Sequence, residues 1–243
     1  MSDYHVKSNQ KKMCGRFTQF SNPDELAELF SVREFAAFIP EPSYNLAPKQ
    51  FLRAIVGHEN RRLGALRWGL VPAWAKSEEI GQKLINARAE TLAEKPSFRE
   101  AFKKRRCMIP ANGFYEWRKS AKGKVPMYIY QKSEKPFALA GLYEIWRTPA
   151  GESLGTCTIV TTEPNSLMAS IHNRMPAILS PANIDSWLDR SISETAQLHQ
   201  LLQPFPSEKM AAYKISSLVN SPKNNSEACF KPVSLSDAST EIS

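Results

Sequence analysis

Six short segments of the chain carry polar side chains that the packing of a hydrophobic core would not require. They supply a thiol, a carboxyl, an imidazole, amides and guanidinium groups, which act in proteins as nucleophiles, proton carriers and phosphate ligands. The segments are Met-Cys-Gly-Arg-Phe (13–17), Tyr-Asn-Leu-Ala-Pro (44–48), Trp-Gly-Leu-Val-Pro-Ala-Trp (68–74), Ile-Asn-Ala-Arg-Ala-Glu-Thr (85–91), Gly-Phe-Tyr-Glu-Trp (113–117) and Ile-His-Asn-Arg-Met-Pro (171–176). Each therefore contains candidates for a functional site.

Cys14 has distinctive chemistry if it becomes the N-terminus of the chain. Its amine can then form an imine with an aldehyde, and its thiol can close a five-membered thiazolidine on the same carbon. An α-amine titrates near about 8 and a lysine near about 10.4, so much more of the α-amine is nucleophilic at neutral pH. Because twelve residues precede Met13, this chemistry requires translation from Met13 or removal of the extension. The alternative is an inert, partly buried thiol.

Glu116 and His172 are the candidate proton carriers. On a strand, Glu116 shares a face with Phe114 while Tyr115 and Trp117 point to the other face. A carboxyl on an apolar face is suited to proton transfer near neutral pH, because burial raises the pKa of such a group. The alternative is a carboxylate that faces solvent at a sheet edge. His172 has a side chain that ordinarily titrates near neutrality, although a lone histidine is usually structural.

Asn86 and Arg88 are two residues apart, so on an extended segment they point the same way. Arginine offers a forked donor to phosphate, and asparagine can bond a sugar or phosphate oxygen. We expect Glu90 to form an ion pair that holds Arg88 in place. Trp74 follows Val-Pro-Ala in a predicted loop and is a candidate to stack on an exposed base, whereas Trp68 is expected in the core.

The elements that must position these residues are short. A helix is predicted over 22–32, where Asn22 can cap it and Pro23 suits its first position. Further helices are predicted near 97–106, 163–170, 180–181 onward and 193–202, and residues 40–48 are predicted as loop. Strands are predicted at 51–56, 66–70, 107–109, 113–117, 126–130, 137–146, 156–161 and 213–216. This irregular order predicts a single α+β domain over 13–232, built on a curved, largely antiparallel, barrel-like sheet with inserted helices.

Composition narrows the class of protein. Residues 1–12 are expected to be a flexible extension or an expression remnant, and residues 233–243 a disordered tail. The chain shows neither a signal peptide nor an apolar run long enough to span a bilayer, so a cytoplasmic monomer is expected, associated with the nucleoid if the source is bacterial. Lys and Arg outnumber Asp and Glu by 32 to 24, a net charge of +8 that favours nucleic acid as partner. The run 103–106 is expected to be a solvated helix end.

The four cysteines stand far apart, which excludes a zinc site or a disulfide framework. No metal or organic cofactor is expected. Cys107 and Cys157 lie in apolar runs and are expected to be small core residues. Cys14 differs from them because it has little to pack against locally.

The six segments, in this order and spacing over about residues 13–225, resemble the SRAP family of SOS-response-associated-peptidase-like proteins. The resemblance implies a DNA-repair protein that forms a thiazolidine crosslink with abasic sites in single-stranded DNA, near a junction with duplex. It implies Cys14, Glu116, His172 and Asn86 as catalytic residues. His172 would assist opening of the deoxyribose ring. The DNA contacts that it implies come from Arg16, Arg88, Arg174, Trp74, Pro48 and Thr161.

Two other functions remain open at this stage. The first is a thiol peptidase or autopeptidase, in which Cys14 is the nucleophile, His172 the base and Glu116 the orienting group. Such a peptidase needs the thiol but not a free amine beside it. The second is a protein that recognises damaged or modified DNA without covalent chemistry, which would function fully as a Cys14→Ala variant. A lyase-type activity on the abasic site is a further possibility within the crosslinking hypothesis.

Overall fold

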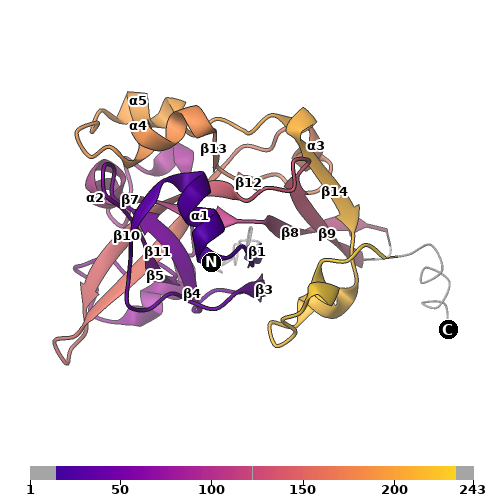
Figure 1. Ribbon diagram of the computed structural model, residues 1–243, viewed down its shortest axis with the longest axis horizontal. Coiled ribbons are helices and arrows are strands. Elements are labelled where there is room, and N and C mark those ends of the chain that lie inside the picture. The colour runs from indigo at the N-terminus through magenta and orange to yellow at the C-terminus, as the bar shows by residue number, and fades with distance from the viewer. Residues whose placement is uncertain (1–14, 122, 234–243) are drawn as a thin grey trace, which may run out of the picture.

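The computed structural model describes residues 15–121 and 123–233, and within them five strands close into a barrel (Figure 1). Neighbouring strands pair antiparallel along most of the ring, and β5 and β11 close it as a parallel pair in which Thr156 lies opposite Arg67. In order around the barrel the strands are β11 (Ser153–Thr162), β10 (Phe137–Arg147), β7 (Arg106–Ala111), β4 (Phe51–Val56) and β5 (Arg61–Trp68).

Shorter strands extend this sheet. They are β2 (Val32–Phe35) beside β5, β6 (Asn86–Arg88) and β12 (Met175–Pro176) beside β11, and β13 (Ile178–Leu179) beside β10. A second sheet is antiparallel and has the order β14 (Met210–Lys214), β9 (Gly123–Gln131), β8 (Gly113–Ser120), β1 (Phe17–Gln19) and β3 (Ser43–Leu46). Strands β8, β9 and β14 project to the side of the molecule away from the helices α2 (Arg99–Lys104), α4 (Ile184–Leu188) and α5 (Thr195–Gln200) (Figure 1).

The helices are short. They are α1 (Pro23–Phe30), α2 (Arg99–Lys104), α3 (Ser166–Ala169), α4 (Ile184–Leu188) and α5 (Thr195–Gln200). Short 3₁₀ helices lie at Glu78–Lys83, Ala89–Thr91, Pro181–Asn183, Ser207–Lys209, Ser217–Asn220 and Glu227–Cys229. Within the described ranges, no helix is long and apolar enough to cross a membrane.

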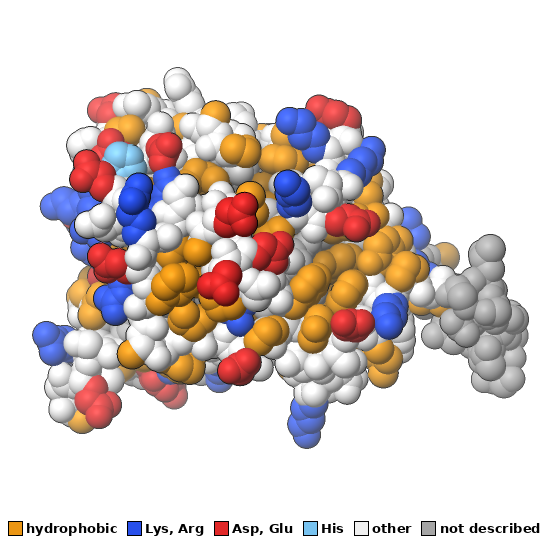
Figure 2. Space-filling model, in the orientation of Figure 1, with side chains coloured by type: hydrophobic (Ala, Val, Ile, Leu, Met, Phe, Trp, Pro, Cys, Tyr) orange, Lys and Arg blue, Asp and Glu red, His pale blue; other side chains and the backbone are white. Residues whose placement is uncertain are grey.

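Strand β7 is buried on both faces because its alternate residues join two different cores. On β7, Ile109 packs in a cluster shared with the second sheet, whereas Met108 packs in a cluster shared with α1, α2, α4 and α5. A third, aromatic cluster joins β8, β9 and β14 to the C-terminal segment (216–230), with Tyr115, Tyr128 and Phe230 in contact. Figure 2 shows hydrophobic side chains gathered over this part of the molecule.

The predicted α+β fold with a barrel-like sheet is confirmed, and several elements lie where the sequence predicts them. Asn22 caps α1 by accepting a hydrogen bond from the backbone of Glu25, and β4 covers the predicted residues 51–56. Cys107 and Cys157 are fully buried in the core. The predicted loop 40–48 is wrong in part, because β3 pairs there with β1. The helix predicted near 97–106 is shorter, since α2 spans Arg99–Lys104 and Phe98 precedes it without a side-chain cap.

Arg106 corrects the prediction of a solvated helix end at 103–106. It is 4% exposed and opens β7. Burial lowers the pKa of its guanidinium to about 10. The guanidinium donates hydrogen bonds to backbone carbonyls of Phe102, Lys103, Trp187, Asp189 and Ile192. Arg106 therefore ties α2 and α4 to the barrel and leaves only the preceding residues of the run at the surface.

Candidate functional site

Glu116 lies on β8, in the part of the second sheet nearest the start of the described chain. Phe17 of β1 pairs with Phe114, and the backbone N–H of Tyr115 donates to the carbonyl of Arg16 (3.0 Å). Glu116 is 3% exposed, so it is not a solvent-facing edge carboxylate. The predicted alternation holds, since Phe114 packs in the barrel core and Tyr115 and Trp117 in the aromatic cluster. Cys14 itself lies outside the described residues, as do the extension 1–12 and the tail from residue 234.

His172 follows α3 and shares a cavity of about 430 Å³ with Glu116. Its backbone N–H donates to the carbonyl of Met168 (2.7 Å) and so continues the turn of α3. Its ring Nδ1 lies within hydrogen-bond distance of both the backbone N–H (3.2 Å) and the carbonyl oxygen (3.3 Å) of Arg174, so the backbone of Arg174 orients the ring. The cavity is lined further by Trp117, Lys119, Lys124 and residues 169–173. A buried carboxyl and an oriented imidazole thus share one solvent-accessible space.

Asn86 and Arg88 lie on β6, which pairs in parallel with β11. Asn86 lies opposite Ile159, and Arg88 lies opposite Thr161. Both residues occupy the same face of the strand, as their spacing predicts. Asn86 is half-buried, whereas Arg88 is exposed and able to receive an anion.

Arg174 is the partner of Glu90, which corrects the predicted pairing of Glu90 with Arg88. Two guanidinium nitrogens of Arg174 contact the two carboxylate oxygens of Glu90 at 2.6 and 2.9 Å, and one also donates to the carbonyl of Thr161 (2.6 Å). Burial acts to raise the pKa of Glu90, but the hydrogen bond and charge of Arg174, with a further contribution from Arg88, leave it lowered. Thr161 is fully buried, and its hydroxyl donates to the carbonyl of Ala87 (3.4 Å).

Arg16 is held by protein partners rather than left open to solvent. Its guanidinium donates to Oδ1 of Asn45 (2.7 Å) and to the carbonyls of Val219 (2.7 Å) and Asn220 (3.1 Å). Burial lowers the pKa of Arg16. Asn45 is buried, and its amide nitrogen contacts the carbonyls of Val219, Ser221 and Asn224. Sequence reasoning missed this clamp, in which the C-terminal segment fixes the residue two positions after Cys14.

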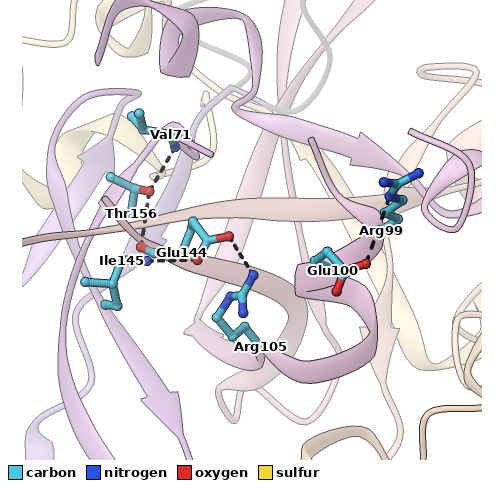
Figure 3. Close-up of polar contacts among 7 residues, drawn as sticks. All are labelled: Val71, Arg99, Glu100, Arg105, Glu144, Ile145 and Thr156. Atoms are coloured by element: carbon cyan, nitrogen blue, oxygen red, sulfur yellow. Dashed lines mark hydrogen bonds and ion pairs between the residues drawn. The ribbon is translucent and has the colours of Figure 1, made fainter. Parts of the chain in front are cut away.

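Trp74 is 61% exposed in the loop after β5, and Trp68 is buried as predicted. Figure 3 shows how this loop is anchored, since the N–H of Val71 donates to the hydroxyl of Thr156 (2.9 Å), beside the ion pair of Arg105 and Glu144 (2.7 Å). The indole N–H of Trp146 also donates to the carbonyl of Ala75 (2.7 Å). The loop is therefore held at both ends while its tryptophan faces solvent.

Pro48 is half-buried in the turn after β3. Neither Pro48 nor Trp74 is among the described residues that line the cavity of Glu116 and His172. Trp117, Lys119 and Lys124 do line it, although sequence reasoning gave them no role. The signal for the first two was their position directly after Glu116, in the segment Glu-Trp-Arg-Lys.

Comparison with known proteins gives concordant results. Residues 13–222 match the model of the family described as SOS response associated peptidase (SRAP). The chain is 54% identical over 220 residues to the abasic site processing protein YoqW of Bacillus subtilis, covering 88% of this chain and 97% of that protein. It is 32% identical over 227 residues to the abasic site processing protein HMCES of Gallus gallus, covering 80% and 67% respectively. A crystal structure of a protein from Bacteroides thetaiotaomicron superposes with a TM-score of 0.81 at 34% identity, covering 90% of this chain and all of that one.

Proposed function

Because the chain belongs to the SRAP family, we propose that it processes abasic sites in DNA, by trapping the aldehyde of the open sugar through Cys14 as N-terminal residue. The names of its relatives YoqW and HMCES, abasic site processing proteins, support this substrate. The chemistry needs an amine and a thiol on one terminal residue. No metal or organic cofactor is required for it.

One observation carries this proposal: Arg16, two residues after Cys14, lies against the strand that bears a buried carboxyl. The carbonyl of Arg16 accepts from the N–H of Tyr115, the neighbour of Glu116, and Cys14 is two residues before Arg16. Glu116 in turn lines one cavity with His172. A buried carboxyl, an imidazole and the residues that follow Cys14 thus belong to one small region.

The proposed reaction is a condensation with loss of one water. The amine nitrogen of Cys14 attacks the aldehyde carbon, and Glu116 carries the proton that moves from nitrogen to oxygen in forming the carbinolamine. The hydroxyl leaves as water, which gives the imine. The thiol sulfur then attacks the same carbon, its proton passes to nitrogen, and the five-membered ring is closed. His172 assists the earlier opening of the deoxyribose ring by moving a proton from the C1′ hydroxyl to the ring oxygen.

The surrounding residues would hold the DNA strand. Arg88 is exposed and offers its guanidinium to a phosphate, and Asn86 on the same face offers its amide to the sugar. Arg174 is committed to Glu90 and to Thr161, so we assign it the orientation of His172 through its backbone N–H. Trp74 would stack on an unpaired base, which favours single-stranded DNA, near a junction with duplex.

Intact mass spectrometry tests this function. A preparation that begins at Cys14 is expected to gain the mass of an abasic oligonucleotide minus one water, in a complex that survives denaturant. A chain that retains residues 1–13 is the matched control, because its Cys14 nitrogen is an amide. Cys14→Ser keeps the amine and should give only an imine, visible after borohydride reduction. If the preparation that begins at Cys14 left the oligonucleotide unmodified, the proposal would be wrong.

Acetylation of the mature N-terminus separates this function from a thiol peptidase. It removes the nucleophilic amine and leaves the thiol, so the DNA adduct should disappear. Any peptide cleavage that depends on the thiol alone would continue. An adduct that persists after complete acetylation would contradict the thiazolidine.

A further inference from the structure

A second cavity, of about 670 Å³, lies between the β8–β9 hairpin and the C-terminal segment. Its walls come from the end of β8, the start of β9, the end of β14 and residues 215–233. Lys124, Lys214 and Lys231 line it, and we call it the lysine groove. Ser120, Ser216 and Asn220 add polar groups to its walls. The lining therefore combines positive charge with hydrogen-bonding side chains.

The lysine groove adjoins the cavity of Glu116 and His172. Lys124 lines both cavities. Trp117 lines the cavity of Glu116, and its indole N–H donates to Oδ1 of Asn220 (2.8 Å), which lines the groove. One ligand can therefore extend from the buried carboxyl past Lys124 into the groove.

The lysines of this region carry charge that the described part of the chain does not neutralise. Lys119 and Lys124 lie directly opposite each other on β8 and β9, an arrangement of like charges that destabilises a sheet. Among the described residues, neither forms an ion pair, nor does Lys214. Lys231 lies 3.6 Å from Glu227, but both side chains are mostly exposed, and such a pair contributes little. An anion bound between the lysines would remove this repulsion.

We propose that the lysine groove binds the sugar-phosphate backbone of the nucleotides on one side of the abasic site. This inference rests on the proposed function, which brings the abasic nucleotide to Glu116. A single strand fits the observations because the three lysines come from separate segments, Lys124 from β9, Lys214 from the end of β14 and Lys231 from the C-terminal residues, and separate cations suit successive phosphates. The binding is expected on one side only, since the groove meets the cavity of Glu116 at Lys124 and Trp117.

Binding measurements with a triple variant test the proposal. In Lys124→Gln/Lys214→Gln/Lys231→Gln three charges of the groove are removed, and in the matched control Lys95→Gln/Lys104→Gln/Lys135→Gln three exposed charges elsewhere are removed. The ligands carry a tetrahydrofuran analogue of the abasic site, which has no aldehyde and so reports binding alone. One ligand is short on both sides, and two others are lengthened on the 5′ side or the 3′ side only.

We expect wild type to gain affinity from lengthening one of the two sides, and the groove variant to lose that gain. Each phosphate contact of a single strand contributes about 0.7 to the slope of log affinity against log salt concentration, so three contacts should lower the slope by about 2. This corresponds to a loss of up to about 100-fold at 0.1 M salt. The control variant should behave like wild type.

Three results would overturn the proposal: no loss of affinity in the groove variant, an equal loss of affinity for the short ligand, or an equal loss of affinity in the control variant. The aldehyde form of the short oligonucleotide keeps this test separate from the proposed function. Wild type and the double variant Lys214→Gln/Lys231→Gln, which leaves Lys124 in the cavity of Glu116 unchanged, should both crosslink to it at saturating protein. Failure of both proteins to crosslink would reject the trapping chemistry. The affinities for the ligands lengthened on one side would still show whether the groove binds the DNA backbone.

Discussion

Replacing Asn45 by alanine is expected to loosen the C-terminal segment from the second sheet and from Arg16. Asn45 is 1% exposed and contacts four groups at once. Its amide nitrogen lies 3.3, 3.0 and 2.8 Å from the carbonyls of Val219, Ser221 and Asn224, and its Oδ1 accepts from Arg16 at 2.7 Å. Alanine removes all four contacts and leaves buried groups without these partners.

The size of the effect follows from the number of hydrogens available. The amide has only two N–H groups, so its three carbonyl contacts count as two hydrogen bonds, each worth about 1 kcal/mol. The bond from the charged Arg16 adds about 1.5 kcal/mol. The total of about 3.5 kcal/mol corresponds to an opening equilibrium changed by about 300-fold.

Amide hydrogen exchange measures this change locally. In Asn45→Ala we expect the protected amides of residues 216–230 that exchange by local opening to do so about 300-fold faster than in wild type. Amides of the barrel strands β7 and β10 should keep their rates. Asn22→Ala, which removes the cap of α1 instead, is the matched control and should leave the C-terminal segment unchanged.

Asn45→Asp separates the two halves of the contact set. The aspartate still accepts from Arg16 but presents a carboxylate oxygen to three carbonyls, so exchange in the segment should accelerate as in the alanine variant. If Asn45→Asp behaved like wild type, the contact with Arg16 alone would hold the segment. If Asn45→Ala left the exchange rates at 216–230 unchanged, the contacts of Asn45 would contribute nothing to holding the C-terminal segment, and the prediction would be wrong.

Two further predictions concern stability. In Gly113→Ala the new Cβ would lie 2.2 Å from Cζ of Tyr128, whose hydroxyl is hydrogen-bonded to the hydroxyl of Thr18. We therefore expect the free energy of unfolding, measured in urea, to fall by about 3 kcal/mol. An unchanged free energy of unfolding would mean that the ring can move aside. In Glu90→Gln the pair with Arg174 loses its charge. Arg174 holds the pKa of Glu90 below its ordinary value of 4.5, although burial acts to raise it. The pair therefore stabilises the fold fully at pH values above 4.5, and this stabilisation is lost as the pH falls through the lowered pKa of the folded state. The difference in Tm between wild type and Glu90→Gln should therefore be constant from about pH 6 to 8 and shrink below about pH 4, and a constant difference down to pH 3 would contradict the assignment.

Local sequence signals correctly predicted the helices and strands that are specified by their own residues. Asn22 and Pro23 are a cap and a first-turn residue whatever surrounds them, and the apolar run 51–56 forms β4 as predicted. Strands β1 and β3 are only three and four residues long, and they form because Phe17 pairs with Phe114 and Leu46. Pairing between distant segments leaves no local pattern, so these strands were missed.

Guanidinium partners were the least predictable part of the site. The segment motifs marked Arg174, Glu90 and Arg16 as polar residues of interest. Glu90 pairs with Arg174, 84 positions away, although Arg88 is its neighbour in sequence. Arg16 bonds carbonyls 203 and 204 positions away. Carbonyl acceptors are common to every residue, so no sequence pattern identifies them. Glu116 and His172 were marked as candidates by their residue types, but only the structure shows that they line one cavity.

During translation β5 is synthesised long before β11, yet it is the parallel pairing of these two strands that closes the barrel. A nascent chain that ends before Ser153 has an open edge at β5, and β6 has no strand to pair with. Asn86 and Arg88 thus gain their scaffold only when β11 has been made. The order of synthesis therefore delays assembly of the site until most of the polypeptide exists, however early its first residues leave the exit tunnel.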